Sequence, residues 1–314
     1  MRYLFLMDPL DTVKMNKDTS FAFMEAACER GHEVFYVAKG AIFLQDGEVF
    51  FHATRVTPQR QPKQPFIVGE SATLAAHETD AVFIRPDPPF DEEYLMNTWL
   101  LDLAKRHTFV MNDPAGVRTV NEKIWATQFT DFTPRTLITR RQDDYAAFLS
   151  EEKDIIVKPT NGHGGKSVFH VREGDLNANV VFETLTNMGR FEVVVQEYLP
   201  AATEGDKRIL LLDGDYLGAV LRVHSEFDHR NNFFAGGSAQ AAAITPREVE
   251  IIAALKPHLR LLGLHFVGID TIGDALVEVN VTSPTGIQEA SEFAGERLAD
   301  RVIDFVEIEA AQVK

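Results

Sequence analysis

The segment Leu264–Gln288, LHFVGIDTIGDALVEVNVTSPTGIQ, carries the pattern that decides the fold of this chain. Two apolar runs, His265–Ile269 and Ala275–Val281, lie on either side of the dipeptide Gly273-Asp274, which is typical of tight turns. Short apolar runs separated by such a turn predict a β-hairpin.

Three polar side chains interrupt this hairpin. Asp270 ends the first strand, and Glu278 and Asn280 lie two residues apart on the second, where alternation places both on one face. Two carboxylates and one amide oxygen are too few for a calcium cage but suit Mg²⁺, which takes its other ligands from water and substrate phosphates. A two-residue loop would pair Asp270 with Val277 and turn Glu278 away, so a metal site requires a three-residue loop with a bulge. The alternative is an ordinary hairpin whose polar residues face solvent.

The composition limits the classes of function. A chain of 314 residues can bury a large core, and we expect two or three domains. The formal net charge of -16 argues against nucleic-acid binding, because no long stretch is basic enough to offset phosphate repulsion. Cys28 is the single cysteine, which excludes a disulfide framework and fits a reducing cytosol. The apolar start YLFLM is too short to span a membrane, so we predict a first strand and a cytoplasmic protein with no membrane partner.

The segment 1–111 alternates strand patterns with helical patterns. Such alternation predicts a mostly parallel sheet, whose ligands bind beyond the carboxyl ends of its strands. Asp8 follows the first strand, and Arg85 follows a later one within RPDPPFD, where prolines fix the chain and leave the guanidinium free to meet an anion. The alternative is that Arg85 pairs with Asp87 or Asp91 and only holds the loop in place.

The glycine-rich loop TNGHGGKS, residues 160–167, invites a P-loop interpretation that the sequence does not support. A Walker A motif needs glycine where this chain has Thr160, and the following SVFHV is typical of a strand, not a helix. The loop can still cover phosphates with its backbone N–H groups, the alternative being an ordinary mobile turn. Lys158, at the end of IIVK, favours the phosphate interpretation, since a buried ammonium needs an anion nearby.

The segment 115–243 supplies further candidates. A helix is predicted over Ala115–Phe129, and Arg208 and Arg222 stand at ends of two adjoining apolar strands. A single strand-end arginine is usually solvated, but two near a metal would neutralise phosphate and substrate carboxylates. Ser225–Ala243 is predicted as a lid or binding loop, because structureless loops of about twenty residues usually have that role.

The order of these features resembles that of the ATP-grasp superfamily of carboxylate–amine ligases and, within it, that of the bacterial glutathione synthetases. The supporting strings span nearly the whole chain: MDPL, KDTSF, RPDPPFDEEY, VNEKIW, GDKRILLLDG, FAGG, VGIDTIGD and VNVTSPTGI. The resemblance implies an α/β (α+β) ATP-grasp fold. It divides the chain into an N-terminal open parallel-sheet domain (1–120), a central lid domain (121–200) and a C-terminal antiparallel-sheet catalytic domain (201–314).

The resemblance also implies an activity. The family joins γ-glutamylcysteine to glycine with ATP and Mg²⁺, giving glutathione, ADP and phosphate through an acyl phosphate. Two Mg²⁺ ions are expected, with Mn²⁺ as the alternative ion, and the family's tendency to form tetramers implies a homotetramer or another homo-oligomer. Positioning and charge neutralisation can drive such a reaction without a protein nucleophile.

Carried over by motif, the site residues fall into groups. The metal ligands are Asp270, Glu278 and Asn280. The ATP contacts are Lys123, Lys158, Gly162, Gly164, Gly165, Glu197, Tyr198, Leu199, Lys207 and Arg208. The peptide and glycine contacts are Asp8, Arg85, Arg222, Ser283, Pro284, Thr285 and Gly286, and the catalytic charges are Arg208 and Arg222.

Two departures from the family leave the substrates open. The segment 223–235 lacks the proline that many relatives have after the strand-end arginine, and Gln288 stands where some members carry arginine, which would remove a carboxylate contact. The alternatives are another ATP-grasp ligase, D-alanine–D-alanine-like or glutamate-adding, or an ATP-binding protein of this fold without turnover.

Overall fold

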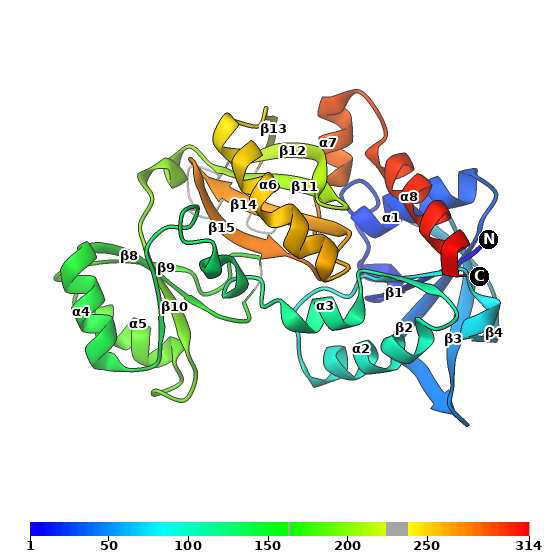
Figure 1. Ribbon diagram of the computed structural model, residues 1–314, viewed down its shortest axis with the longest axis horizontal. Coiled ribbons are helices and arrows are strands. Elements are labelled where there is room, and N and C mark those ends of the chain that lie inside the picture. Colours follow the sequence, from blue (N-terminus) through cyan, green and yellow to red (C-terminus); the bar gives the residue numbers. More distant parts are fainter. Residues whose placement is uncertain (163, 224–237, 314) are drawn as a thin grey trace.

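The structure is a computed structural model that describes residues 1–162, 164–223 and 238–313. This part of the chain forms three β-sheets, which come in the order N-terminal sheet, lid sheet and third sheet along the sequence. In space the third sheet lies between the other two (Figure 1). No helix among the described residues is both long and apolar enough to cross a membrane.

The N-terminal sheet has the strand order β4-β3-β2-β1-β5-β6. Its strands are β1 (Arg2–Met7), β2 (Glu33–Gln45), β3 (Glu48–Pro58), β4 (Phe66–Ala75), β5 (Ala81–Ile84) and β6 (Phe109–Met111). The strands β2, β1, β5 and β6 run parallel, as predicted, while β3 and β4 extend the sheet antiparallel. The strand β4 was not predicted, because most of this edge strand is exposed and carries no alternating apolar pattern.

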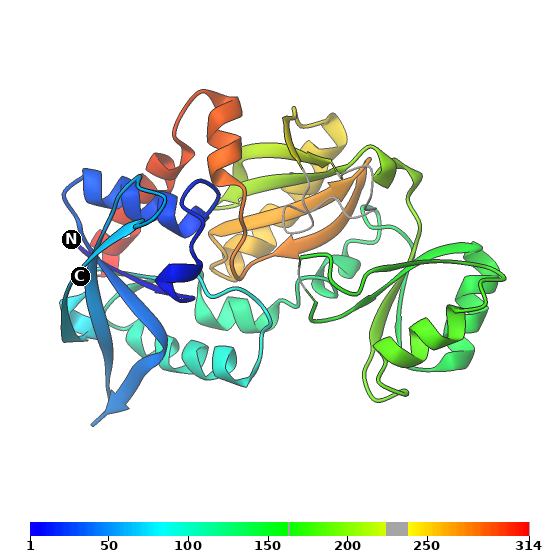
Figure 2. The same ribbon diagram turned by 180° about the vertical axis from the view of Figure 1, so that it is seen from behind.

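Helices cover both faces of this sheet. They are α1 (Thr19–Glu29) and α8 (Leu298–Val313) on one face, and α2 (Glu92–Ala104) and α3 (Pro114–Thr119) on the other (Figures 1 and 2). Successive residues of β1 alternate between the two cores: Phe5 packs with the α1 and α8 side, and Leu4 and Leu6 pack with the α2 side. The C-terminal helix α8 thus returns to the sheet with which the chain begins.

The lid sheet has the order β7-β10-β8-β9 and is antiparallel. It contains β7 (Thr136–Thr139), β8 (Asp154–Pro159), β9 (Phe169–Arg172) and β10 (Val193–Glu197), with α4 (Gln142–Glu152) and α5 (Ala178–Leu185) on one face. Tyr145 and Phe182 stack with ring centroids 4.4 Å apart in a core separate from the other two. The lid therefore has its own hydrophobic core.

The third sheet has the order β13-β12-β11-β14-β15. It contains β11 (Asp206–Leu212), β12 (Asp215–Val223), β13 (Ser238–Ala241), β14 (Phe266–Ile272) and β15 (Ala275–Asn280), with α6 (Pro246–Leu261) and α7 (Ile287–Ala294) on opposite faces. Short 3-10 helices complete the described elements: η1 (Leu10–Thr12), η2 (Ala76–Glu78), η3 (Trp125–Gln128) and η4 (Pro200–Thr203).

Two sequence predictions about these elements are wrong. The helix predicted over Ala115–Phe129 is interrupted between α3 and η3, because Asn121 accepts the N–H groups of Lys123 and Ile124 in a local turn. The loop predicted over Ser225–Ala243 contains the strand β13, which pairs with β12. Residues 224–237 of that loop lie outside the described part of the chain.

Candidate active site

The β14–β15 hairpin sets the register of the predicted metal ligands. Ile272 pairs with Ala275 across a two-residue turn, so the predicted three-residue loop is wrong. The predicted bulge is confirmed: Val277 is the extra residue, and Asp270 lies directly opposite Glu278. Asn280 Nδ2 lies 3.2 Å from Asp270 Oδ2, so the three polar side chains meet on one side of the hairpin.

Asp270 is nearly completely buried between two arginines. Arg208 lies opposite it on β11 and binds it through two bonds, Nε to Oδ1 at 2.5 Å and Nη2 to Oδ2 at 2.9 Å. Arg222 Nη2 lies 3.0 Å from Asp270 Oδ2. Burial alone would raise the pKa of Asp270, but the two guanidinium groups outweigh it and hold the pKa well below its usual range.

Arg222 also pairs with Asp206, which lies opposite it across β11 and β12. Its Nε donates to Asp206 Oδ1 at 3.0 Å, and its Nη2 contacts the other carboxylate oxygen. We call Asp206, Arg208, Arg222 and Asp270 the arginine cluster. Its two positive and two negative side chains balance within one buried patch of the third sheet.

Gly268 makes room for this cluster. A Cβ at this position would lie 3.0 Å from Arg208 Cδ and 2.9 Å from Pro284 Cβ, closer than packed carbons allow. The absence of a side chain lets Arg208 cross over β14, where its Nη1 lies 3.3 Å from the carbonyl oxygen of Thr285.

A second group of charges lies between the lid and the hairpin. Lys123 Nζ and Lys158 Nζ lie 3.5 Å and 3.8 Å from the same atom, Glu278 Oε1. We call Lys123 and Lys158 the lysine pair. Both are buried, and each also donates to a neutral oxygen: Lys123 to Gly162 O at 2.5 Å and Lys158 to Gln196 Oε1 at 3.3 Å. Burial lowers the pKa of Lys158 from its usual value, with Glu278 opposing the shift and Lys123 adding to it.

The glycine-rich loop lies beside the lysine pair. Gly162 accepts from Lys123, and Asn121 Nδ2 donates to Thr160 O at 3.2 Å. Gly164 and Gly165 have φ of +63° and +70°, a backbone conformation that L side chains rarely adopt. His163 of this loop lies outside the described residues.

The segment Glu197–Leu199 connects the lid to the third sheet. Backbone hydrogen bonds tie Glu197 to Arg135 O and Tyr198 to Asp154 O, both at 3.0 Å. The Tyr198 ring stacks on His170, with centroids 4.0 Å apart. Since Gln196 contacts Lys158, this strand end lies next to the lysine pair.

On the substrate side, Arg85 is buried and holds two segments together. Its Nε donates to Ser20 Oγ and its Nη2 to Pro284 O, both at 3.0 Å, while Ser283 Oγ donates to Arg85 O at 3.2 Å. Desolvation lowers the pKa of Arg85, and Asp18 opposes the shift. Gly286, with φ of +108°, ends this turn and begins α7.

Two predicted site residues lie in other surroundings. Asp8 accepts from Asp87 N at 2.7 Å and pairs with Lys39 Nζ at 2.6 Å. Lys207 lies on the opposite face of β11 from Arg208, where its Nζ contacts the fully buried Glu248 at 2.7 Å. The structure therefore does not bring Lys207 to the lysine pair or to the arginine cluster.

Two residues that were not predicted as site residues, Glu122 and Asn112, hold the site together. Glu122 Oε1 accepts from Val281 N, Thr282 N and Thr282 Oγ1 at 2.8–3.1 Å. Asn112 donates from Nδ2 to Phe266 O and Val281 O, and it accepts from Phe266 N, each at 2.8 Å. Single polar residues at loop starts carry no periodic signal, although Glu122 stands next to Lys123 in the string VNEKIW.

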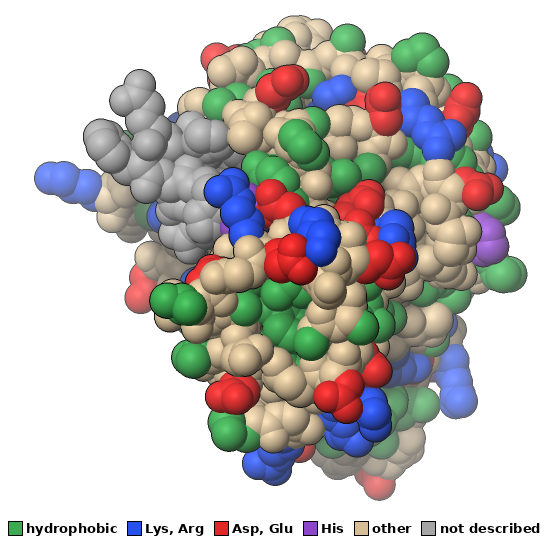
Figure 3. Space-filling model, turned by 90° about the vertical axis from the view of Figure 1, so that its left-hand side faces the viewer, with side chains coloured by type: hydrophobic (Ala, Val, Ile, Leu, Met, Phe, Trp, Pro, Cys, Tyr) green, Lys and Arg blue, Asp and Glu red, His purple; other side chains and the backbone are tan. Residues whose placement is uncertain are grey.

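Figure 3 shows the face of the molecule at the lid end. Among the described residues, acidic and basic side chains are interspersed on it.

Comparisons with known protein families cover almost the whole chain. Residues 1–118 match the model of the prokaryotic glutathione synthetase N-terminal domain. Residues 122–295 match the model of the prokaryotic glutathione synthetase ATP-grasp domain.

Individual proteins show the same similarity. The chain is 42% identical to a glutathione synthetase of Mesorhizobium japonicum, with 96% of each chain covered. It is 39% identical to one of Pseudomonas aeruginosa over 99% of each chain. Among solved structures, D-cycloserine synthetase DcsG matches with a TM-score of 0.68 at 16% identity, over 99% of this chain and 100% of that one. The ATP-grasp ligase PsnB matches with a TM-score of 0.62 at 19% identity, over 97% of this chain and 98% of that one. These two likenesses show a shared ATP-grasp fold.

Proposed function

The chain belongs to the prokaryotic glutathione synthetase family, and from that premise we propose that it ligates γ-glutamylcysteine to glycine with ATP, giving glutathione, ADP and phosphate. The carboxylate of the dipeptide attacks the γ-phosphorus of ATP, and ADP leaves. The amine of glycine then attacks the resulting acyl phosphate, loses a proton and displaces inorganic phosphate.

The observation that carries this proposal is the charge of the lysine pair. Two buried ammonium groups share one carboxylate, and burial lowers the pKa of Lys158. An anion at this place would stabilise both ammonium groups, and the neighbouring glycine-rich loop can supply backbone N–H groups to the same anion. The triphosphate of ATP is an anion of the required kind.

The donor set on the hairpin fits a divalent ion. Asp270 and Glu278 supply carboxylate oxygens, Asn280 supplies an amide oxygen, and the bulge brings them to one side. Asp270 accepts three bonds from Arg208 and Arg222 and one from Asn280 Nδ2, which together fill its about four lone-pair sites, so an ion would bind Asp270 in place of one of these donors. We propose that these residues hold Mg²⁺, as two ions, with Mn²⁺ as the alternative. Such an ion neutralises charge on the phosphate oxygens.

The protein's own contribution is positioning and positive charge. Arg208, held in place by its two bonds to Asp270, is proposed to stabilise the transferred phosphoryl group. Glu197, Tyr198 and Leu199 are proposed to contact adenine. Arg222 and the turn Ser283–Gly286 are proposed to face the peptide and glycine. Arg85 holds that turn through its hydrogen bond to Pro284 O.

A coupled assay of ADP release over pairs of dipeptides and amines tests the proposal. We expect ADP release to require γ-glutamylcysteine, glycine and the divalent ion together, with one glutathione formed per ADP. Preference for another acceptor or dipeptide would make the chain a different ATP-grasp ligase. Nucleotide binding without turnover on any pair would make it a binding protein of the same fold.

We further propose that the enzyme works in the cytoplasm as a homotetramer or another homo-oligomer. The single cysteine supports a reducing compartment, and the family resemblance supports the assembly. Light scattering of the purified protein measures the assembly, and a molar mass equal to one chain would contradict it.

A further inference from the structure

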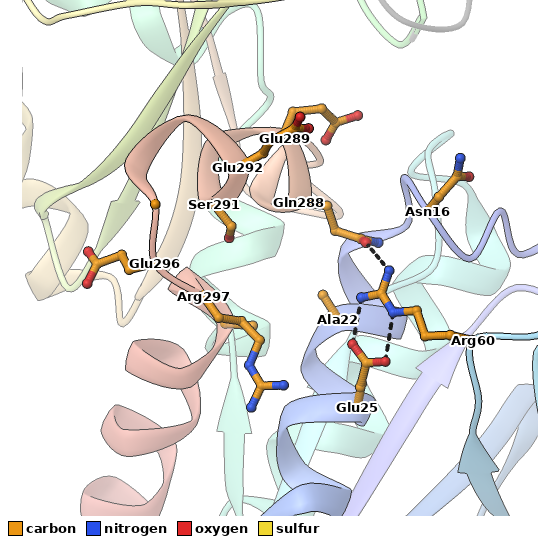
Figure 4. Close-up of a pocket in the computed structure, with 12 residues that line it drawn as sticks. Asn16, Ala22, Glu25, Arg60, Gln288, Glu289, Ser291, Glu292, Glu296 and Arg297 are labelled. Carbon is orange, nitrogen blue, oxygen red and sulfur yellow. Dashed lines mark hydrogen bonds and ion pairs between the residues drawn. The ribbon is translucent and has the colours of Figure 1, made fainter.

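Gln288, the second residue of α7, joins three segments of the chain (Figure 4). Its Nε2 donates to Met15 O at 3.0 Å and to Asp18 O at 2.6 Å. Its Oε1 accepts from Arg60 Nη1 at 3.1 Å. The side chain therefore uses both of its N–H bonds and its carbonyl oxygen.

Arg60 determines which way this amide points. Its guanidinium is held by Glu25 of α1 through two bonds, Nε to Oε1 at 2.8 Å and Nη2 to Oε2 at 2.6 Å (Figure 4). Because Arg60 can only donate, the Gln288 amide must turn its oxygen to Arg60 and its nitrogen to the two carbonyls. Glutamate at 288 could accept from Arg60 but could not donate, and arginine could donate but would face a second guanidinium.

The hydrogen bonds of Gln288 close a ring around the substrate side. The loop that it holds, residues 15–18, leads into α1, where Ser20 accepts from Arg85. Arg85 in turn donates to Pro284, four residues before Gln288. The loop and the Ser283–Gly286 turn are thus connected twice, once through Arg85 and once through Gln288.

We propose that Gln288 is a positioning residue, oriented by Arg60 and Glu25, which holds loop 15–18 on α7 and so keeps the Ser283–Gly286 turn in place for the peptide and glycine. The inference rests on the proposed function, because that function places the turn at the substrates. No metal ligand or ATP contact lies in the ring itself, and Arg208 meets the turn only from outside the ring, through Thr285 O at 3.3 Å.

A cavity of about 500 Å³ borders this contact (Figure 4). Asn16, Arg60 and Gln288 line one part of it, and Glu292 and Arg297 another. If the Gln288 amide is removed, water in the cavity can satisfy the carbonyls of Met15 and Asp18. We therefore expect substitutions at 288 to shift the loop without unfolding the protein.

Steady-state kinetics of Gln288→Glu and Gln288→Ala test the proposal. Both should raise KM for the dipeptide or glycine about tenfold, the value of one or two lost hydrogen bonds, and leave KM for ATP within about twofold. Glu292→Gln is the matched control, on the same helix and the same cavity but outside the ring, and it should change neither constant. Arg60→Met changes a side chain that is 49% exposed, and it should raise KM for the dipeptide or glycine by a smaller factor. This variant replaces the 288 variants in the test if they fail to fold.

Hydrogen exchange of the backbone amides of residues 15–22 is the second measurement. Exchange should be faster in Gln288→Glu than in the wild type and unchanged in Glu292→Gln. Unchanged exchange, or an equal rise of KM for all three substrates, would overturn the positioning role. A wild-type enzyme without ligase activity would instead remove the proposed function, and the exchange measurement would still report whether the ring exists.

Discussion

The arginine cluster and the lysine pair are both buried, yet their charges are balanced differently. In the arginine cluster two guanidinium groups meet two carboxylates, with bonds fixed by the register of β12, β11 and β14. In the lysine pair two ammonium groups meet the single carboxylate of Glu278 on β15: Lys158 comes from the lid sheet and Lys123 from the segment between α3 and η3. Breaking the balanced cluster should therefore destabilise the third sheet, whereas the excess positive charge of the lysine pair supports the proposal that an anion binds there.

Asp270→Asn should have the largest effect, because it breaks the balance of the arginine cluster. Two buried guanidinium groups would face the carboxylate of Asp206 alone, which should lower the free energy of unfolding by about 3–5 kcal/mol and abolish ligation. Urea denaturation measures the change. A decrease in the free energy of unfolding below about 1 kcal/mol would mean that solvation by water, and not Asp270, stabilises the two guanidinium groups.

Glu278→Gln should act on both catalysis and stability. The substitution removes a proposed metal ligand and the carboxylate that the lysine pair shares, while the backbone pairing of β14 and β15 remains. Turnover should fall at least about 10²-fold, and the free energy of unfolding should fall as well, because two buried ammonium groups lose their anion. Turnover near the wild-type value would remove Glu278 from the metal site. Glu289→Gln, at a carboxylate outside the hairpin, is the control and should retain turnover.

Lys158→Met should separate stability from function. Removing one of two ammonium groups leaves Lys123 and Glu278 balanced, so the nucleotide-free protein should become more stable by about 1 kcal/mol. Lys207→Met is the matched control: it leaves the buried Glu248 without its ammonium partner and should lower stability by about 2–3 kcal/mol. Thermal unfolding without nucleotide measures both, and a loss of stability in Lys158→Met would contradict the charge argument.

Gly164→Ala should have the smallest effect. The positive φ of Gly164 makes a Cβ unfavourable by about 1 kcal/mol, which should distort the glycine-rich loop and raise KM for ATP about threefold to tenfold. Gly174 has φ of +84° and open space around it, in a turn outside this loop. Gly174→Ala should cost similar stability and leave KM for ATP unchanged, and an equal rise in both variants would remove the loop from the nucleotide site.

The sequence predicted the parts of the site that depend on local pattern. The apolar runs around Gly273-Asp274 predicted the hairpin, and the metal interpretation predicted the bulge that places Asp270 opposite Glu278, although the three-residue loop predicted with it is wrong. The resemblance to the family predicted that Lys123 and Lys158 belong to one site, and both lie within 3.8 Å of Glu278 Oε1.

The remaining features depend on contacts between distant segments. Lys207 and Arg208 are neighbours in GDKRILLLDG, but the strand turns them to opposite faces. Lys207 contacts Glu248 and Arg208 contacts Asp270, and the sequence does not show which of the two faces belongs to the site. Likewise, nothing near Gln288 in the sequence points to Met15, Asp18 or Arg60. Such tertiary pairings leave no periodic signal along the chain.

Calorimetric titration of a non-hydrolysable ATP analogue with Mg²⁺ tests the role of the lysine pair most directly. We expect binding to the wild type, about 10²-fold weaker binding to Lys158→Met and wild-type affinity in Lys207→Met, because Lys158 contributes to the excess positive charge whereas Lys207 is paired with Glu248. Equal affinities of the wild type and Lys158→Met would contradict this role of the lysine pair.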